Sequence, residues 1–216
     1  MAMAPGLVAA VSEGAGETLA RLFEPRRVRR GKVLYRPDAP AEEVFWLELG
    51  WVRLYRLDEE GEEVTIGVVG PGELFGEAAL LPGREYGHYA EVMVPGALYA
   101  AAGWKLMKMA ERSPEVGELL ARLLAERLWR AQKRLLDRRY RAVEERLAAL
   151  LLTLAREGEE GLEVRLFQKD LALLVGAGRE TVSRLLARLA ERGLLELGYG
   201  KVVLKDPAGL EERCAG

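Results

Sequence analysis

Residues 168–192, QKDLALLVGAGRETVSRLLARLAER, form the stretch around which this chain is organised. Apolar residues over 171–175 predict a first short helix. Gly176 and Gly178 bracket a tight turn, where a residue without Cβ adopts positive φ at low cost. A second helix is predicted from apolar residues at i, i+3, i+4 and i+7, which form one buried stripe. That stripe consists of Val182, Leu185, Leu186 and Leu189. Two helices joined by one tight turn are typical of domains that recognise bases in the major groove of DNA.

The polar face of the second predicted helix carries hydrogen-bonding side chains. Opposite the apolar stripe lie Arg179, Glu180, Ser183 and Arg184. One alternative is an ordinary helical hairpin with a solvated face, in which Glu180 and Arg184 form a surface ion pair worth roughly 0.2–0.5 kcal/mol. The pattern Arg-Glu-x-x-x-Arg at a helix start favours DNA reading. An ion pair with Glu180 and recognition of a base by Arg184 are compatible, since the pair would orient the arginine toward the base.

The composition indicates a soluble protein with one large domain or two modest ones. Of the 216 residues, 50% are apolar, which is ample for a packed core, and no apolar run is long enough to span a membrane. The N-terminus lacks the basic and apolar regions of a signal peptide, so we expect a cytoplasmic protein. Asparagine is absent and Arg and Glu abound, a thermophile-like composition that a GC-rich genome would also produce.

The rarest residues restrict the chemistry. Cys214 is the single cysteine, which excludes a disulfide framework within the chain and any iron–sulfur or zinc site built on several thiolates. His88 is the single histidine and lies far from Cys214 in the sequence, and no nucleophile–base constellation is visible. We therefore expect no enzyme activity, no metal and no cofactor. The net charge of −2 gives no overall sign of nucleic-acid binding.

From residue 26 to about residue 101, short apolar runs alternate with glycine-bearing turns. Their spacing predicts an antiparallel barrel or sandwich, with a polar hairpin tip over 58–62. We expect the aromatic residues of this region to be core rather than a ligand cage; they are Phe45, Trp46, Trp51 and Tyr55. Residues 72–81 interrupt the strands with a short helical turn that can present backbone N–H groups to an anion.

A long helix follows, with Ser113 as its N-cap and Pro114 at its first position. It runs without a breaker to about residue 139, too long for one small barrel to cover. Leu119, Leu120 and Leu123 are expected to pack on the β-domain. A second apolar stripe at 4-3-4-3-4 spacing predicts a dimer seam, although burial of the helix within its own subunit is the alternative. The seam consists of Gly117, Ala121, Leu124, Leu128, Ala131 and Leu135.

The C-terminal part begins with a further helix over 141–156 and a loop over 157–161. After the two helices of the opening stretch, residues 193–204 predict a two-stranded hairpin. A hairpin directly after such a helix is a winged helix-turn-helix arrangement, with Lys201 near the wing tip for a phosphate. We therefore expect a β-domain over 1–112, a dimerisation helix over 113–138 and a DNA-binding domain over 139–216.

The whole order of parts resembles the CRP/FNR family of bacterial transcription regulators, over about residues 22–206. The resemblance is carried by Gly50 and Gly61 in the strands, the 72–77 segment GELFGE, the long helix and, most specifically, the 175–184 segment VGAGRETVSR. It implies an α+β fold in which an N-terminal β-roll, a jelly roll like that of cyclic-nucleotide-binding domains, precedes a dimerisation helix and a C-terminal winged helix-turn-helix. It also implies a homodimer that regulates transcription, usually as an activator that recruits RNA polymerase. Repression follows from the same contacts where the operator overlaps a promoter.

The resemblance implies roles on double-stranded DNA. Arg179 and Arg184 would donate to guanine O6 and N7, and Glu180 would accept from cytosine N4. These contacts predict a TGTGA-like half-site, repeated as an inverted pair about one helical turn apart. The residues expected to hold phosphates are Gln168, Lys169, Thr181, Ser183 and Lys201. Gln168 stands where the family commonly has an arginine, so that contact is expected to be weaker.

The effector site departs from the pattern of cyclic-nucleotide-binding members. Their Gly-Glu pair is present as Gly76 and Glu77, but their Arg-Ser pair falls at His88 and Tyr89, and their Thr-Ser pair at Ala131 and Gln132. A cyclic phosphate without its arginine loses a charge-assisted contact. We therefore expect a regulator that is independent of cyclic AMP. The alternatives are a sensor for cyclic AMP or another small ligand in the β-roll, and haem at His88, although a lone histidine is more often structural.

Overall fold

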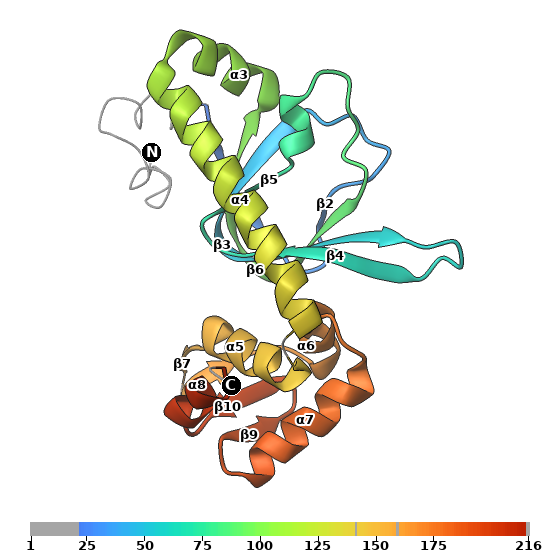
Figure 1. Cartoon of the computed structure of the whole chain (residues 1–216), viewed down its shortest axis with the longest axis vertical. Coiled ribbons are helices and arrows are strands. Elements are labelled where there is room, and N and C mark those ends of the chain that lie inside the picture. Colours follow the sequence, from blue (N-terminus) through green and yellow to red (C-terminus); the bar gives the residue numbers. More distant parts are fainter. Residues whose placement is uncertain (1–21, 141, 159, 215–216) are drawn as a thin grey trace. The chain divides into compact units, whose positions relative to one another are not determined.

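The structure is a computed structural model that describes residues 22–140, 142–158 and 160–214, with side chains described everywhere in these ranges except over 133–140. The chain divides into two compact units, Met1–Ala131 and Gln132–Gly216 (Figure 1). The first is mainly an antiparallel sheet with helices, and the second is a small α+β unit. None of the helices over the described residues combines the length and apolar character that crossing a membrane requires.

The N-terminal unit contains one six-stranded antiparallel sheet that curls into a roll. Its order is β1-β6-β3-β4, while β2 pairs with β6 and β5 pairs with β3. The two long strands, β3 and β6, each bind several partners along their length, which bends the sheet around a shared interior. The strands are β1 (Glu24–Val28), β2 (Val33–Tyr35), β3 (Glu43–Leu57), β4 (Glu63–Val69), β5 (Glu73–Phe75) and β6 (Tyr89–Ala102).

The apolar run at the start of β3 is continuous because both of its faces are buried. Phe45 and Leu47 point into the interior of the roll, whereas Val44 and Trp46 point to a second cluster under the helices. Alternate residues of a strand face opposite sides of a sheet, so one strand supplies two cores. Tyr55 is buried as well, and Trp51 is half-buried. The expectation that these aromatics are core is confirmed for three of the four.

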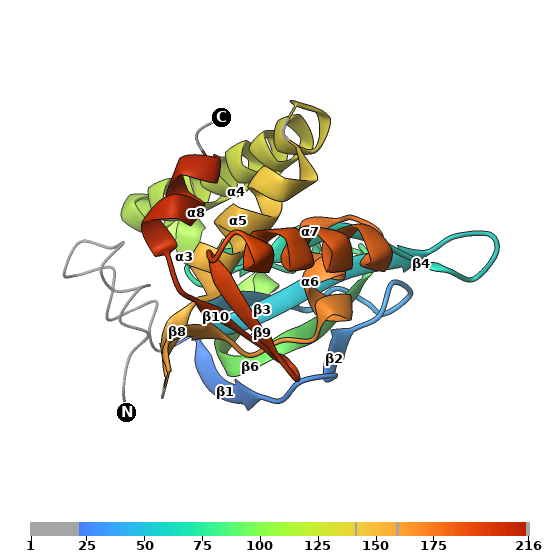
Figure 2. The ribbon, with the colours of Figure 1, turned by 90° about the horizontal axis from the view of Figure 1, so that it is seen from below.

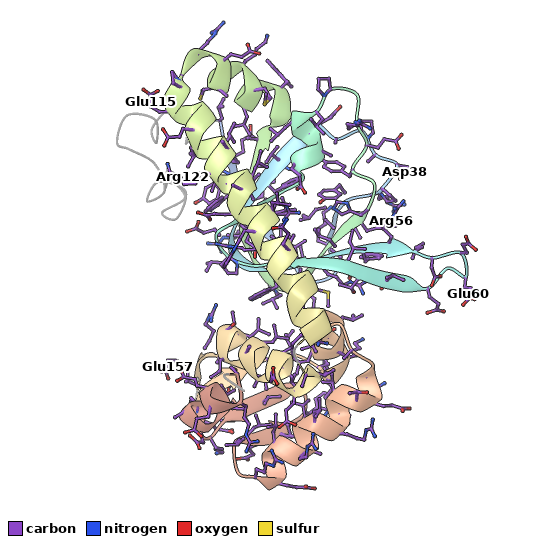
Figure 3. The ribbon with its side chains drawn as sticks, viewed as in Figure 1. Asp38, Arg56, Glu60, Glu115, Arg122 and Glu157 are labelled. Carbon is purple, nitrogen blue, oxygen red and sulfur yellow. The ribbon has the colours of Figure 1, made fainter. Side chains whose placement is uncertain are left out.

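The polar hairpin tip lies between β3 and β4, as expected. The Asp58 carboxylate accepts hydrogen bonds from the backbone N–H groups of Glu60 (3.0 Å) and Glu62 (2.9 Å). Figure 3 shows Glu60 at the end of this hairpin. The expectation for 72–81 needs correction, because its first part is the strand β5 and only Glu77–Leu80 is helical, as the 3-10 helix η1. Residues 73–75 form a strand because they pair with β3.

Among the described residues, the sheet is followed by the helices α3 (Gly103–Arg112) and α4 (Pro114–Tyr140), and α4 continues beyond Ala131, where the first unit ends. The buried face of α4 consists of Val116, Leu119, Leu120 and Leu123, which pack on the sheet as expected. Pro114 does occupy the first helical position. Ser113 acts differently from a side-chain cap, because its hydroxyl donates to the Glu115 carboxylate (2.6 Å) and its carbonyl accepts from the N–H of Val116 (3.1 Å).

The C-terminal unit combines four helices with a four-stranded antiparallel sheet in the order β7-β8-β10-β9 (Figure 2). The residues expected to form a loop over 157–161 are instead part of a hairpin. Its second strand pairs with β10, with Val164 opposite Val202 and both buried. The hydrophobic pattern within 157–164 does not predict this strand, because its burial depends on pairing with a strand distant in the sequence. The elements are α5 (Val143–Leu154), β7 (Arg156–Gly158), β8 (Gly161–Val164), α6 (Gln168–Val175), α7 (Arg179–Glu191), β9 (Leu195–Gly198), β10 (Lys201–Leu204) and α8 (Pro207–Cys214).

The predicted turn between α6 and α7 is confirmed with one correction. Gly176 ends α6 in the left-handed region (φ 70°), and its N–H donates to the carbonyl of Ala172. Gly178, in contrast, has a φ of −64°, which any residue adopts, and serves as the N-cap of α7. Only one of the two glycines is therefore required by backbone conformation.

Candidate DNA-binding interface and effector pocket

The helix α7 is fixed to its unit by the predicted apolar stripe and presents the predicted polar face outward. Val182, Leu186 and Leu189 are fully buried and Leu185 nearly so. Arg179, Glu180 and Arg184 are all exposed. The structure thus brings the three predicted base-reading residues together within the first turn and a half of one helix.

The charges of α7 fall into two groups. Within residues 142–158 and 160–214, no ion pair engages Arg179, Glu180 or Arg184, so the surface pair considered as an alternative does not form. Further along the helix, Arg188 and Arg192 both bind the Glu144 carboxylate of α5, at 2.7 and 3.3 Å. The Glu144 pairs hold the C-terminal end of the helix, whereas Arg179, Glu180 and Arg184 near its start have no ion partner among the described residues.

The residues predicted to hold phosphates surround the start of α6, the start of α7 and the wing. Lys169 is exposed, and Gln168, Thr181 and Ser183 are half-buried. The start of α6 is stabilised by the buried Asp170, whose carboxylate accepts the backbone N–H of Phe167 (3.3 Å), as in one half of a capping box.

Lys201 is in the predicted place but is already paired. Its Nζ lies 2.8 Å from the Glu160 carboxylate. The hydrogen bond with Lys201 lowers the pKa of Glu160, and the same bond raises the pKa of Lys201. Glu160 was not foreseen, because its contact with β10 depends on the β7–β8 hairpin that the sequence pattern did not predict.

A groove of about 410 Å³ lies between the start of α6 and the β9–β10 wing. Cations line it at Lys169, Arg179 and Lys201, together with the aromatic side chains of Phe167 and Tyr199. Tyr199 is 97% exposed, the most exposed large hydrophobic side chain among the described residues. Sequence reasoning missed both aromatics, although the two-residue link between β9 and β10 places Tyr199 at the hairpin tip.

The predicted effector residues Gly76 and Glu77 lie at the start of η1. Gly76 has a φ of 76°, and a Cβ there would lie 2.9 Å from the carbonyl oxygen of Glu43, so glycine is required. Glu77 forms a 3.0 Å ion pair with Arg127 of α4. Its second carboxylate oxygen is buried and accepts no hydrogen bond from the described residues. Arg127 was missed because its role depends on where α4 crosses η1.

His88 is part of an aromatic cluster inside the roll. Its Nε2 lies 3.0 Å from the hydroxyl of Tyr35, whose ring stacks on Tyr86 with centroids 3.7 Å apart. Burial lowers the pKa of the His88 imidazole against the opposing effect of the Glu77 carboxylate, and burial raises the pKa of the Tyr35 phenol far above its ordinary value. Phe45 and Phe75 stack beside this pair.

The other predicted effector residues do not join this cluster. Tyr89 stacks instead on Tyr55, with centroids 4.8 Å apart. Ala131 and Gln132 are exposed. Over the described residues, no group of three or more His, Cys, Asp or Glu side chains is placed to hold a metal ion.

The outer face of α4 keeps apolar side chains in water. Leu128 is 60% exposed, Ala121 and Ala131 are exposed, and Gly117 and Leu124 are half-buried. The side chain of Leu135, the last residue of the predicted seam, lies outside the described set. Trp129, which was not part of the predicted seam, is also 60% exposed.

Comparison with known proteins agrees with this architecture. Residues 25–113 match the model of the cyclic nucleotide-binding domain, and residues 145–213 match the Crp-like helix-turn-helix domain. The chain is 36% identical to the cyclic AMP receptor protein of Thermus thermophilus, covering 90% of this chain and 89% of the relative. It is 34% identical to the transcriptional regulator SdrP of the same organism, covering 90% and 96%.

Solved structures show the same fold. A CRP-family transcriptional regulator from Thermus thermophilus superposes with a TM-score of 0.76 at 28% identity, covering 88% of this chain and 97% of that one. A CRP/FNR-family regulator from the same organism gives 0.72 at 31% identity, covering 89% and 99%. The predicted fold, a β-roll followed by a long helix and a winged helix-turn-helix, is thereby confirmed, and this chain belongs to the CRP/FNR family of DNA-binding transcriptional regulators.

Proposed function

We propose that this protein is a cytoplasmic homodimer that activates transcription from a TGTGA-like inverted repeat without requiring cyclic AMP. The observation that carries the proposal is the division of charge along α7. Arg179, Glu180 and Arg184 are exposed and form no ion pair with the described residues, whereas the later arginines are held by Glu144. Side chains left without partners keep their full hydrogen-bonding capacity for bases.

The chemistry of these three side chains supports the sequence of the half-site. An arginine donates two parallel hydrogen bonds to O6 and N7 of guanine, and a glutamate accepts from N4 of cytosine. Each good pair discriminates against the wrong base by about 1–3 kcal/mol. The phosphate set around α6, α7 and the wing would fix the register of the protein on the duplex. Lys201 would exchange Glu160 for a phosphate, at low cost because that ion pair is at the surface.

The exposed stripe on α4 supports the homodimer. Leu128 leaves most of its surface in water in a single chain, and small residues lie one and two turns away on the same face. A second copy would cover this stripe with its own, since such a two-fold interface is self-complementary. Two recognition helices related by that axis would match the inverted repeat. Recruitment of RNA polymerase is the expected route to activation, as the relatives are transcriptional regulators.

Independence from cyclic AMP is supported by the interior of the roll. The aromatic rings of Tyr35 and Tyr86 stack inside it, and the His88 imidazole bonds to Tyr35. Glu77 is engaged by Arg127, and no arginine stands at the position where cyclic-nucleotide-binding members hold the phosphate. A phosphate there would lack its charge-assisted partner.

One observation favours an effector-dependent regulator as the second candidate. The free, buried oxygen of Glu77 is an acceptor suited to a ligand hydroxyl. The relatives also include the cyclic AMP receptor protein named above and a CRP-like cAMP-activated global transcriptional regulator of Mycobacterium tuberculosis, 31% identical over 96% of this chain.

The test is a fluorescence-anisotropy titration of a palindromic TGTGA-type duplex against a scrambled duplex, at fixed salt, with and without millimolar cyclic AMP. We expect selective binding without the nucleotide and no change on adding it. The melting temperature should likewise stay constant, because a ligand that binds only the folded state must raise it. Selective binding that appears only with cyclic AMP would establish the second candidate, and equal binding to both duplexes would contradict the half-site.

A further inference from the structure

The groove between α6 and the wing holds two aromatic side chains that the base-reading residues do not use. Phe167 is 39% exposed and immediately precedes α6, and Tyr199 occupies the wing tip. Their rings meet edge to face, with centroids 5.5 Å apart and planes at 81°. Leaving such a pair in water forgoes the burial that normally stabilises aromatic side chains.

The Phe167 ring is held in place by the turn beside it. Gly200 has a φ of 65°, and a Cβ at this position would lie 3.1 Å from the Phe167 ring. The ring of Phe167 therefore lies directly against the backbone of the wing tip, and the Tyr199 ring stands edge to face with it. A ring that is already held in this way loses little entropy when a ligand covers it.

The charges of the groove identify the ligand class. Lys169, Arg179 and Lys201 bring three cations to its walls, and Gln168 and Lys169, the first two residues of α6, line the same groove. Cations bind phosphates, whereas an exposed aromatic ring offers apolar surface to the carbon face of a sugar. A chain that alternates phosphate with sugar matches both features.

We propose that Phe167 and Tyr199 clamp the deoxyribose–phosphate backbone of one DNA strand in the flank of the half-site. This inference rests on the DNA-binding role proposed above. Arg179 belongs both to the groove and to the base-reading face. A DNA strand with a base bound to Arg179 would therefore place its neighbouring sugar–phosphate backbone at the groove. The aromatic contact carries no charge and reads no base edge. It extends the footprint of the protein equally on any sequence.

The experiment compares the full-length protein with Y199A and Y199F on two duplexes over a range of salt concentrations. One duplex ends at the outer edges of the inverted repeat, and the other extends half a helical turn further at each end. Tyr199 is almost fully exposed, so its replacement leaves the packing of the unit intact. Trp104→Ala serves as the matched control, because Trp104 is an exposed aromatic (59%) on α3.

We expect Y199A to bind the extended duplex about fivefold to tenfold more weakly than the wild type, because the variant loses the apolar ring surface that deoxyribose would cover. The slope of log affinity against log salt should not change, because a phenol ring releases no counterions. Y199F should match the wild type, since the ring makes the contact. Lys169→Ala should instead reduce the salt slope by about one. On the short duplex, Y199A and the wild type should bind alike.

Two results would overturn the clamp: an unchanged affinity of Y199A for the extended duplex, or an equal loss on both duplexes. The first would leave the aromatic pair as a surface for a protein partner. Repeating the measurement on an extended duplex of scrambled sequence separates failure of the clamp from failure of the proposed half-site. If the clamp contacts the backbone, Y199A lowers the affinity for either sequence. A protein that shows no preference for TGTGA but loses affinity with Y199A would refute the half-site and retain the clamp.

Discussion

The interior of the roll and the outer face of α7 hold their polar side chains in opposite ways. In the roll, Glu77 is paired with Arg127, and His88 with Tyr35. On α7, Arg179, Glu180 and Arg184 form no ion pair with the described residues. Side chains that satisfy one another stabilise the fold, whereas side chains that remain free are available to a partner. The contrast is consistent with the proposal that the exposed side chains of α7 bind DNA.

The contrast can be tested region by region, because all four tryptophans lie in the N-terminal unit, at residues 46, 51, 104 and 129. Tryptophan fluorescence therefore reports on that unit and not on the C-terminal unit. Circular dichroism reports both units. A substitution can thus be assigned to the region in which it acts.

The largest effect is expected from Leu128→Glu on the outer face of α4. A charge on a stripe that a second copy covers would be buried without a partner, which strongly disfavours association. Light scattering should give the mass of one chain, and the affinity for the inverted repeat should fall because two linked half-sites no longer act together. Arg122→Ala is the control, since Arg122 is exposed on the same helix (Figure 3). A Leu128→Glu variant that remained dimeric would refute the seam.

The second effect concerns the free side chains of α7. Arg184→Ala should lower the affinity for the TGTGA-type duplex by about 1–3 kcal/mol per half-site and leave weak, salt-sensitive binding to any duplex. Arg188→Ala is a matched control on the same helix, because Arg188 already binds Glu144 and contributes to stability instead. The measurement is anisotropy with specific and scrambled duplexes. If Arg184→Ala kept the full preference, this arginine would not read a base.

The third effect concerns the paired side chains of the roll. Arg127→Ala should lower the free energy of unfolding of the N-terminal unit by about 1–2 kcal/mol, between the values for exposed and buried pairs, because Arg127 is 14% and Glu77 40% exposed. Urea denaturation followed by tryptophan fluorescence measures it. Arg122→Ala, which loses only a long contact with Glu118 at 3.9 Å, should change stability by no more than about 0.5 kcal/mol. Equal effects of the two substitutions would show that the pair does not support the roll.

The smallest effect is the pH dependence of His88. Burial lowers its pKa in the folded state below the ordinary 6.5, so the folded protein favours the neutral imidazole. Its contribution to stability is complete above pH 6.5 and is lost as the pH falls through the lowered folded pKa. As His88 is the only histidine, His88→Gln should remove this loss from the tryptophan-monitored unfolding free energy. Tyr35→Phe keeps the titrating group and should retain it. The same pH profile in His88→Gln and wild type would contradict this origin.

Much of the DNA-binding part could be predicted because its signals are local. The stripe of Val182 and Leu186 has helical period, and Gly176 marks the turn that precedes it. The wing follows from a short link between two apolar runs. In the roll, by comparison, the sequence predicted strands but not their partners, and it assigned His88 and Tyr89 to one pocket although they contact different residues.

The sequence by itself determined the order of the main parts, the turn at Gly176, the polar face of α7 and the apolar stripe of α4, since each depends on residues within a few turns of one another. The tertiary structure alone decided which polar side chains pair with one another. The pairs Glu77–Arg127, Tyr35–His88 and Glu160–Lys201 join residues about 40–53 positions apart, and the β7–β8 hairpin exists because β8 pairs with β10. Contacts of that kind depend on how the chain packs, which no local periodicity encodes.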